Sequence, residues 1–229
     1  MYFDYQYLLY VGPGMLLAML ASFWVRSTFA KYKNVPLSRG RTGADIAAEL
    51  LNRAGVQGVR IERIGGVLSD HYAPGERVLR LSPDVHDGQS VSAAGVAAHE
   101  AGHAIQHASG YGLMRVRQSL VFPMRIGSQL SYFVIFGGMF LHLAGLAWIG
   151  VALFGGVLLF ELVTVPVEID ASRRARKRLL EANLVTPQEA AGVSAVLTAA
   201  AFTYIAAVVT TLLTLLYFIT QINNSSRRR

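Results

Sequence analysis

Residues 126–160 contain no Asp, Glu, Lys or Arg. A membrane-spanning helix needs about 20 mostly apolar residues, so this block, with residues 162–165, is long enough for two short spans. We place the turn between them near residues 142–145, and one long tilted helix is the alternative. The mean hydropathy of +0.40 and a charged fraction of 15% also favour an integral membrane protein over a soluble domain.

Two more apolar stretches lie at the ends of the chain. Residues 7–25 are uncharged and predict a retained membrane anchor. A cleaved signal peptide is the alternative, but residues 1–4 carry no basic side chain and no small-residue cleavage site follows. Thr186-Pro187-Gln188-Glu189 is a capping box that starts an uncharged helix, whose part from residue 201 to 221 predicts the last span.

The region between the first two spans has the pattern of a small α+β domain. Residues 26–37 predict a basic linker, and Thr42 predicts the N-cap of a helix over 43–53. Residues 59–64 and 78–81 alternate apolar and charged side chains and predict two strands, with a turn or short extended segment at 68–75.

The sequence His99-Glu100-Ala101-Gly102-His103 lies in an Ala-rich segment that predicts a helix. Ser90 or Ser92 is the expected N-cap, and the helix is expected to end near Ala108. Positions i and i+4 share one helical face, so His99 and His103 can point at one zinc ion, with Glu100 placed to act as general base. The alternative is a chance pair of histidines on a surface helix. The chain has no cysteine, so a thiolate-bound zinc is excluded.

A catalytic zinc site of this type needs a third protein ligand. Four donors follow the motif: His107, Glu161, Glu168 and Asp170. His107 lies one turn further along the same helix, which is usually too far from the metal. Glu168 is favoured, because it follows a span on the same side of the membrane as the motif. Two histidines from one helix and a glutamate from another form the gluzincin arrangement.

Five segments, taken together, resemble the YugP-type bacterial membrane zinc metallopeptidases, which are distantly similar to HtpX-like proteases. These segments are 42–44, 68–72, 79–82, 97–106 and 166–174. The resemblance implies one zinc ion per chain, held by His99, His103 and Glu168, with Glu100 as the catalytic base.

Several neighbouring residues are candidates for supporting roles. HtpX-like enzymes have the pattern E-x-x-A-D at the third ligand, whereas this chain has Ser172 at the Asp position, so an outer contact made by that carboxylate is in question. Further outer contacts of the site are expected from Asp170, Glu161 and Arg174. His71 or Tyr72 would contact the substrate or the transition state; the alternative is that they belong to a turn that caps the small sheet.

These patterns divide the chain into five parts: a transmembrane helix (1–25), a zincin-like domain (26–125), a transmembrane hairpin (126–165), cytoplasmic helices with the third ligand (166–200), and a final span with a basic tail (201–229). The predicted fold is mainly α and integral to the membrane, with about four spans. Every Lys and Arg except Arg227, Arg228 and Arg229 lies on the side of the motif. The positive-inside rule therefore predicts a cytoplasmic site in a multi-pass protein of the cell membrane.

The predicted function is a zinc-dependent endopeptidase that acts in membrane-protein quality control or peptide turnover. The alternative is a non-proteolytic membrane scaffold with a structural zinc. Expected partners are the lipid bilayer and a peptide or membrane-protein substrate, and the architecture is compatible with a homo-oligomer. The net charge of +7 is assigned to the membrane surface rather than to nucleic acid, because no nucleic-acid-binding motif is present.

Overall fold

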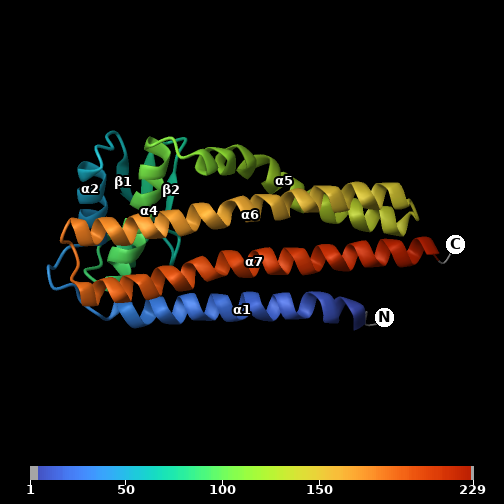
Figure 1. Cartoon of the computed structure of the whole chain (residues 1–229), viewed down its shortest axis with the longest axis horizontal. Coiled ribbons are helices and arrows are strands. Elements are labelled where there is room, and N and C mark those ends of the chain that lie inside the picture. Colours follow the sequence, from blue (N-terminus) through green and yellow to red (C-terminus); the bar gives the residue numbers. More distant parts are fainter. Residues whose placement is uncertain (1–4, 228–229) are drawn as a thin grey trace. The chain divides into compact units, whose positions relative to one another are not determined.

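A computed structural model describes residues 5–227, which contain six long or medium helices, one short helix and three short strands (Figure 1). In chain order they are α1 (Tyr5–Lys33), α2 (Gly43–Arg53), β1 (Arg60–Arg63), β2 (His71–Ala73), β3 (Val78–Leu81), α3 (Pro83–His86), α4 (Val91–Ala108), α5 (Gly112–Phe140), α6 (Ala144–Glu181) and α7 (Pro187–Arg227). By length and composition, α1, α5, α6 and the stretch Pro187–Ser225 of α7 can each cross a membrane. The number of candidate spans agrees with the predicted four, and residues 126–165 fall in two helices, α5 and α6, joined by a short turn.

The described residues form two compact units. The span unit comprises residues 5–22, 115–165 and 203–227, and the sheet unit comprises Phe23–Met114 and Pro166–Phe202. In the span unit, Thr210 of α7 donates a hydrogen bond from Oγ1 to the carbonyl oxygen of Gly14 in α1, at 2.9 Å. A Cβ on Gly150 of α6 would lie 2.7 Å from the backbone nitrogen of Ile135 in α5, so glycine permits this close helix contact.

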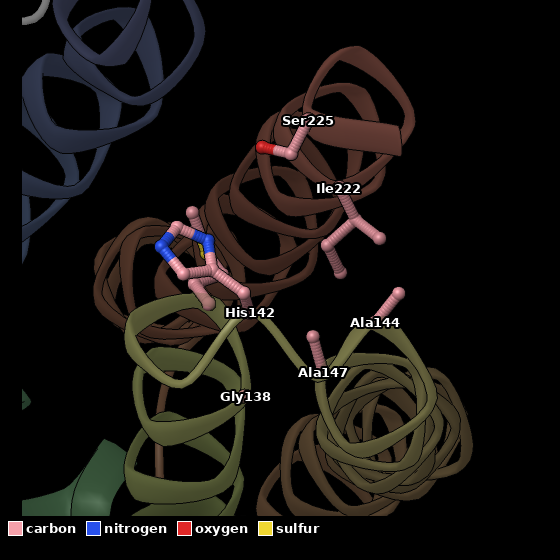
Figure 2. Close-up of a pocket in the computed structure, with 7 residues that line it drawn as sticks. Gly138, His142, Ala144, Ala147, Ile222 and Ser225 are labelled. Carbon is pink, nitrogen blue, oxygen red and sulfur yellow. The ribbon is translucent and has the colours of Figure 1, made fainter. Parts of the chain in front are cut away.

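The turn between α5 and α6 is short, and His142 within it has a positive φ of 59°. A pocket of about 290 Å³ lies beside this turn in the span unit. Figure 2 shows His142 and Ala144 at the turn, with Ile222 and Ser225 of α7 lining the same pocket.

Helix ends differ from the predicted ones, because the prediction placed boundaries where hydropathy changes or where proline occurs. The expected linker at 26–37 is wrong over its first part, since α1 continues to Lys33. The helix ends just before Val35, the residue preceding Pro36, where steric contact with the proline ring disfavours helical backbone. Pro123 and Pro166 lie inside α5 and α6 rather than between helices. Glu168 is therefore in the middle of α6 and not at the start of a separate helix.

The sheet unit contains the three strands in the order β1-β3-β2. β1 pairs with β3 in parallel, with Arg60 opposite Val78, and β2 pairs with β3 antiparallel, with His71 opposite Arg80. The extended segment expected at 68–75 is thus β2, an edge strand. The Asp70 carboxylate accepts hydrogen bonds from the backbone N–H and the hydroxyl of Ser82, which ties the start of β2 to the end of β3.

The core of the sheet unit packs α2, β3 and part of α6 around α4. The predicted N-cap Thr42 forms a capping box with Asp45, and Ser90 caps α4 through a hydrogen bond from the Ala93 amide. The other candidate cap, Ser92, is buried and donates to the Phe29 carbonyl at 2.8 Å. Fully buried members of this core include Ile46, Leu50, Leu79, Leu81, Ala97, Ala98, Ala101 and Leu179.

Helices α4 and α6 lie in close contact at Gly102. A Cβ at this position would lie 2.9 Å from the carbonyl oxygen and 3.5 Å from the Cα of Ala171. Backbone atoms cannot swing away as a flexible side chain can, so only glycine allows this spacing.

We therefore expect Gly102→Ala to force α4 and α6 apart and to lower the free energy of unfolding by about 1–3 kcal/mol, the usual cost of overpacking. The matched control is Gly95→Ala on the same helix, where the added Cβ makes an ordinary 3.5 Å contact with Val193. Thermal unfolding of the detergent-purified variants should show a lower midpoint for Gly102→Ala alone. Equal midpoints would show that the close approach does not constrain the fold.

Candidate metal centre

Helix α4 carries the first two donors on one face. His99 and His103 are one helical turn apart, their rings meet edge to face with centroids 4.6 Å apart, and both are largely buried. The Ala-rich sequence around them gives the helix little side-chain volume on this side. The imidazoles therefore lie between the backbones of α4 and α6 rather than in solvent.

Helix α6 supplies the third donor. Its close contact with Gly102 places Glu168, one turn before Ala171, opposite the two histidines. Glu168 is 1% exposed, and its Oε2 lies 3.1 Å from His99 Nε2 and 3.3 Å from His103 Nε2. Among the residues that the structure describes, these three form the one group of potential metal ligands whose donor atoms all lie within 4.8 Å of one another.

The distances suit a tetrahedral zinc site. Ligand atoms that each lie about 2.0–2.1 Å from a tetrahedral zinc are about 3.3 Å apart. The two measured Nε2–Oε2 distances of 3.1 and 3.3 Å match this spacing. Two imidazoles and one carboxylate leave a fourth position without a protein ligand, as catalytic zinc sites do.

The outer nitrogen of each histidine has its own hydrogen-bond partner. His99 Nδ1 lies 3.1 Å from the hydroxyl of Ser172, and His103 Nδ1 lies 3.0 Å from Oε1 of Gln106. An amide oxygen only accepts hydrogen bonds, so Nδ1 of His103 carries the proton. Nε2 of the same ring faces the Glu168 carboxylate at 3.3 Å, a contact that needs positive charge. A proton on Nε2 supplies that charge without metal, and a bound cation would supply it in place of the proton.

Glu100 is buried beside this group, with 8% of its surface exposed. The pKa of the Glu100 carboxyl is raised to about 7, chiefly by burial and in smaller part by the nearby Glu168 and Asp70 carboxylates, against the opposing effects of His99 and a hydrogen bond from the Tyr72 amide. The proton-accepting form is the ionised one, which predominates above that pKa. A cation held by the three ligands would stabilise this form and lower the pKa.

The other predicted site residues lie at varying distances from the centre. Ser172 contacts His99 directly, so it takes the place expected of the aspartate in E-x-x-A-D, without the charge. The hydroxyl of Tyr72 is 2.9 Å from His107 Nδ1, and His71 Nδ1 is 2.8 Å from the Ser69 carbonyl oxygen. Both side chains thus have partners within the fold, and the two residues are part of β2 rather than of a capping turn.

The remaining candidates, Asp170, Arg174, Glu161 and His107, make hydrogen bonds to residues other than the two histidines of the motif. Asp170 Oδ2 accepts hydrogen bonds from Gln106 Nε2 at 2.8 Å and from Arg174 Nε at 2.5 Å, so these two candidates act as a pair. Glu161 belongs to the span unit, where it accepts a hydrogen bond from the Thr211 hydroxyl at 3.0 Å. His107 pairs with Tyr72. Of the four candidate third ligands, Glu168 is the one whose carboxylate meets both histidines.

The sequence analysis did not identify Gln106. Two features of the sequence could have indicated it: Gln106 lies three residues after His103 on the same helical face, and it is a long polar side chain in an Ala-rich buried helix. A polar residue in such a position needs partners, and here those partners belong to the metal centre.

Two histidines and a carboxylate that could hold one metal ion, with a buried glutamate beside them, form a candidate metal site. Comparison with known proteins agrees: residues 7–223 match the model of a family described as "Putative neutral zinc metallopeptidase". The chain belongs to this family.

A curated relative covers nearly the same length. The chain is 41% identical over 203 residues to the "Putative membrane protease YugP" of Bacillus subtilis (strain 168), which is 89% of this chain and 90% of the relative. The resemblance found in the sequence is therefore confirmed. No solved structure matches the chain.

Replacing Glu168 and, separately, Glu161 of the same helix should show which of the two glutamates binds the metal. We expect Glu168→Ala to lower zinc content well below one ion per chain, because two imidazoles alone hold the metal weakly. Glu161→Ala, on the same helix but with a Thr211 contact, is the matched control and should retain the metal. Elemental analysis of the purified proteins gives the zinc content. Full zinc in Glu168→Ala, or loss in both variants, would contradict the ligand assignment.

Proposed function

We propose that this chain is a multi-pass membrane zinc endopeptidase of the gluzincin type, with His99, His103 and Glu168 as metal ligands and Glu100 as general base. The observation that carries the proposal is the convergence of three ligand atoms beside a buried fourth residue that can accept a proton. A structural zinc would normally have four protein ligands, which disfavours the scaffold alternative.

Zinc held at these ligands would supply Lewis-acid activation of water and of the scissile carbonyl. Glu100 would accept a proton as water attacks and then deliver that proton to the leaving amine. The Glu100 carboxyl group thus serves first as base and then as acid. A pKa between that of an exposed carboxyl group and that of an amine suits both roles. Burial next to His99 provides such an environment.

The edge strand β2 supports a peptide substrate. Its partner β3 lies on one side only, and no strand in the described part of the chain pairs with the other edge of β2. The backbone N–H of Tyr72 donates a hydrogen bond to the Glu100 carboxylate, which indicates that the open edge of β2 faces Glu100. An extended peptide that adds to β2 through main-chain hydrogen bonds would carry its scissile bond past Glu100.

The family and its relative support a membrane-associated protease, and the charge distribution supports a cytoplasmic site. A site on that side, on helices continuous with membrane spans, favours substrates drawn from the bilayer surface. We therefore propose damaged or unassembled membrane proteins, or short membrane peptides, as substrates.

Glu100→Gln tests the mechanism. The amide cannot accept the proton of water, so peptide cleavage should fall by at least about 100-fold, while zinc content stays near that of the wild type. Cleavage is measured with unfolded casein and a set of quenched fluorescent peptides, and Glu76→Gln, an exposed carboxylate, is the control. Cleavage by Glu100→Gln at the wild-type rate would remove Glu100 from the mechanism.

The lack of cysteine allows a clean test of orientation. Gly75→Cys places a thiol at an exposed turn of the sheet unit, and Leu143→Cys places one at the α5–α6 turn, where Leu143 is 53% exposed. A membrane-impermeant maleimide added to intact cells should label Leu143→Cys at once and Gly75→Cys only after permeabilisation. The reverse pattern would place the site outside the cell.

A further inference from the structure

Gln106 is a fully buried polar side chain in α4, with 0% of its surface exposed. Its Oε1 lies 3.0 Å from His103 Nδ1, and its Nε2 lies 2.9 Å from the Val167 carbonyl oxygen and 2.8 Å from Asp170 Oδ2. The single amide group therefore connects one proposed ligand to the backbone of α6 next to another.

Only one orientation of this amide satisfies all three contacts. A carbonyl oxygen and a carboxylate accept hydrogen bonds and cannot donate them, so the Nε2 hydrogens must face Val167 and Asp170. The Oε1 atom is then left facing His103 and must accept the Nδ1 proton. In the neutral imidazole this bond places the single proton on Nδ1, so that Nε2, which faces Glu168 at 3.3 Å, carries the lone pair that metal ligation requires.

The acceptors that fix the amide are themselves held. Asp170 receives a second hydrogen bond from Arg174 at 2.5 Å, and the Arg174 guanidinium lies 5.6 Å from the centre of the Tyr111 ring. The Val167 carbonyl belongs to the backbone of α6. Rotation of the Gln106 amide by half a turn would place oxygen against two acceptors, so the surroundings strongly disfavour that rotation.

We propose that Gln106 is the positioning residue of His103: its amide, fixed by Asp170 and the Val167 carbonyl, holds the imidazole in the tautomer and orientation that bind metal. The inference deepens the proposed function and rests on it, because it concerns a zinc ligand. Gln106 itself contacts neither the metal position nor the substrate edge of β2.

The test exchanges the amide for an apolar side chain of similar size. In the full-length, detergent-purified chain, Gln106→Met should weaken zinc binding about 10–100-fold, the usual effect of removing a partner that orients a metal-binding histidine. Affinity is measured by competition with a chromophoric zinc chelator. The matched control is Gln118→Met in α5, where the same exchange removes a buried amide nitrogen that has no hydrogen-bond partner among residues 5–227, and it should leave zinc affinity unchanged.

A second readout separates positioning from general destabilisation. The visible absorption of the cobalt-substituted protein reports the coordination geometry, so its intensity or band positions should change in Gln106→Met and not in Gln118→Met. A folded Gln106→Met protein with zinc affinity within twofold of wild type and an unchanged cobalt spectrum would show that Gln106 is only a core residue.

Should Gln106→Met fail to fold, Asp170→Asn gives a second test. Asp170 is the partly exposed end of the hydrogen-bond chain that runs from His103 through Gln106. This exchange leaves the core volume unchanged but weakens one acceptor of the amide, so zinc affinity should fall several-fold; unchanged affinity would contradict the proposal. The wild type is measured alongside. A wild type that binds no zinc overturns the proposed function and this inference together, whereas one zinc per wild-type chain with unaffected variants overturns this inference alone.

Discussion

The contact between the backbones of α4 and α6 at Gly102 is the constraint on which the site depends. A helix pair separated by larger side chains would place the Glu168 carboxylate too far from His99 and His103 for one cation to bridge them. Here a Cβ added to Gly102 would be 2.9 Å from the Ala171 carbonyl oxygen, so a residue larger than glycine would force the two helices apart at this point. Gly102 lies between His99 and His103 in the sequence. This short segment therefore supplies two metal donors and also sets their distance from α6.

The sequence predicts features of the site that depend on local spacing. The pair His99 and His103, with Glu100 beside them, follows from helical periodicity alone. Glu168 could be favoured only by assuming which side of the membrane each helix end reaches, because 64 intervening residues lie between it and His103. Gln106 could not be assigned at all, since its role depends on the position of the Val167 carbonyl and Asp170, which only the packed helices define.

The same distinction applies to the fold. Capping residues predicted helix starts well, because Thr42, Ser90 and Thr186 act through hydrogen bonds to amides two or three residues away. Hydropathy predicted the number of spans but not the ends of helices, because a helix continues past the apolar boundary until its backbone is blocked. In α6 that point is Asn183, whose positive φ of 53° marks a left-handed turn after the helix.

The partners of the two histidines are neutral, and this has an electrostatic consequence. Many metal-binding histidines donate to a carboxylate, which adds negative charge to the centre. Here His99 meets a hydroxyl and His103 meets an amide, and the nearest carboxylate of that network, Asp170, is one residue further out and paired with Arg174. The charges of Glu168 and Glu100 would balance a divalent cation, and the Asp70 carboxylate already adds negative charge near Glu100. A further carboxylate at position 172 would add more negative charge, which would raise the pKa of Glu100 and reduce the fraction able to accept a proton.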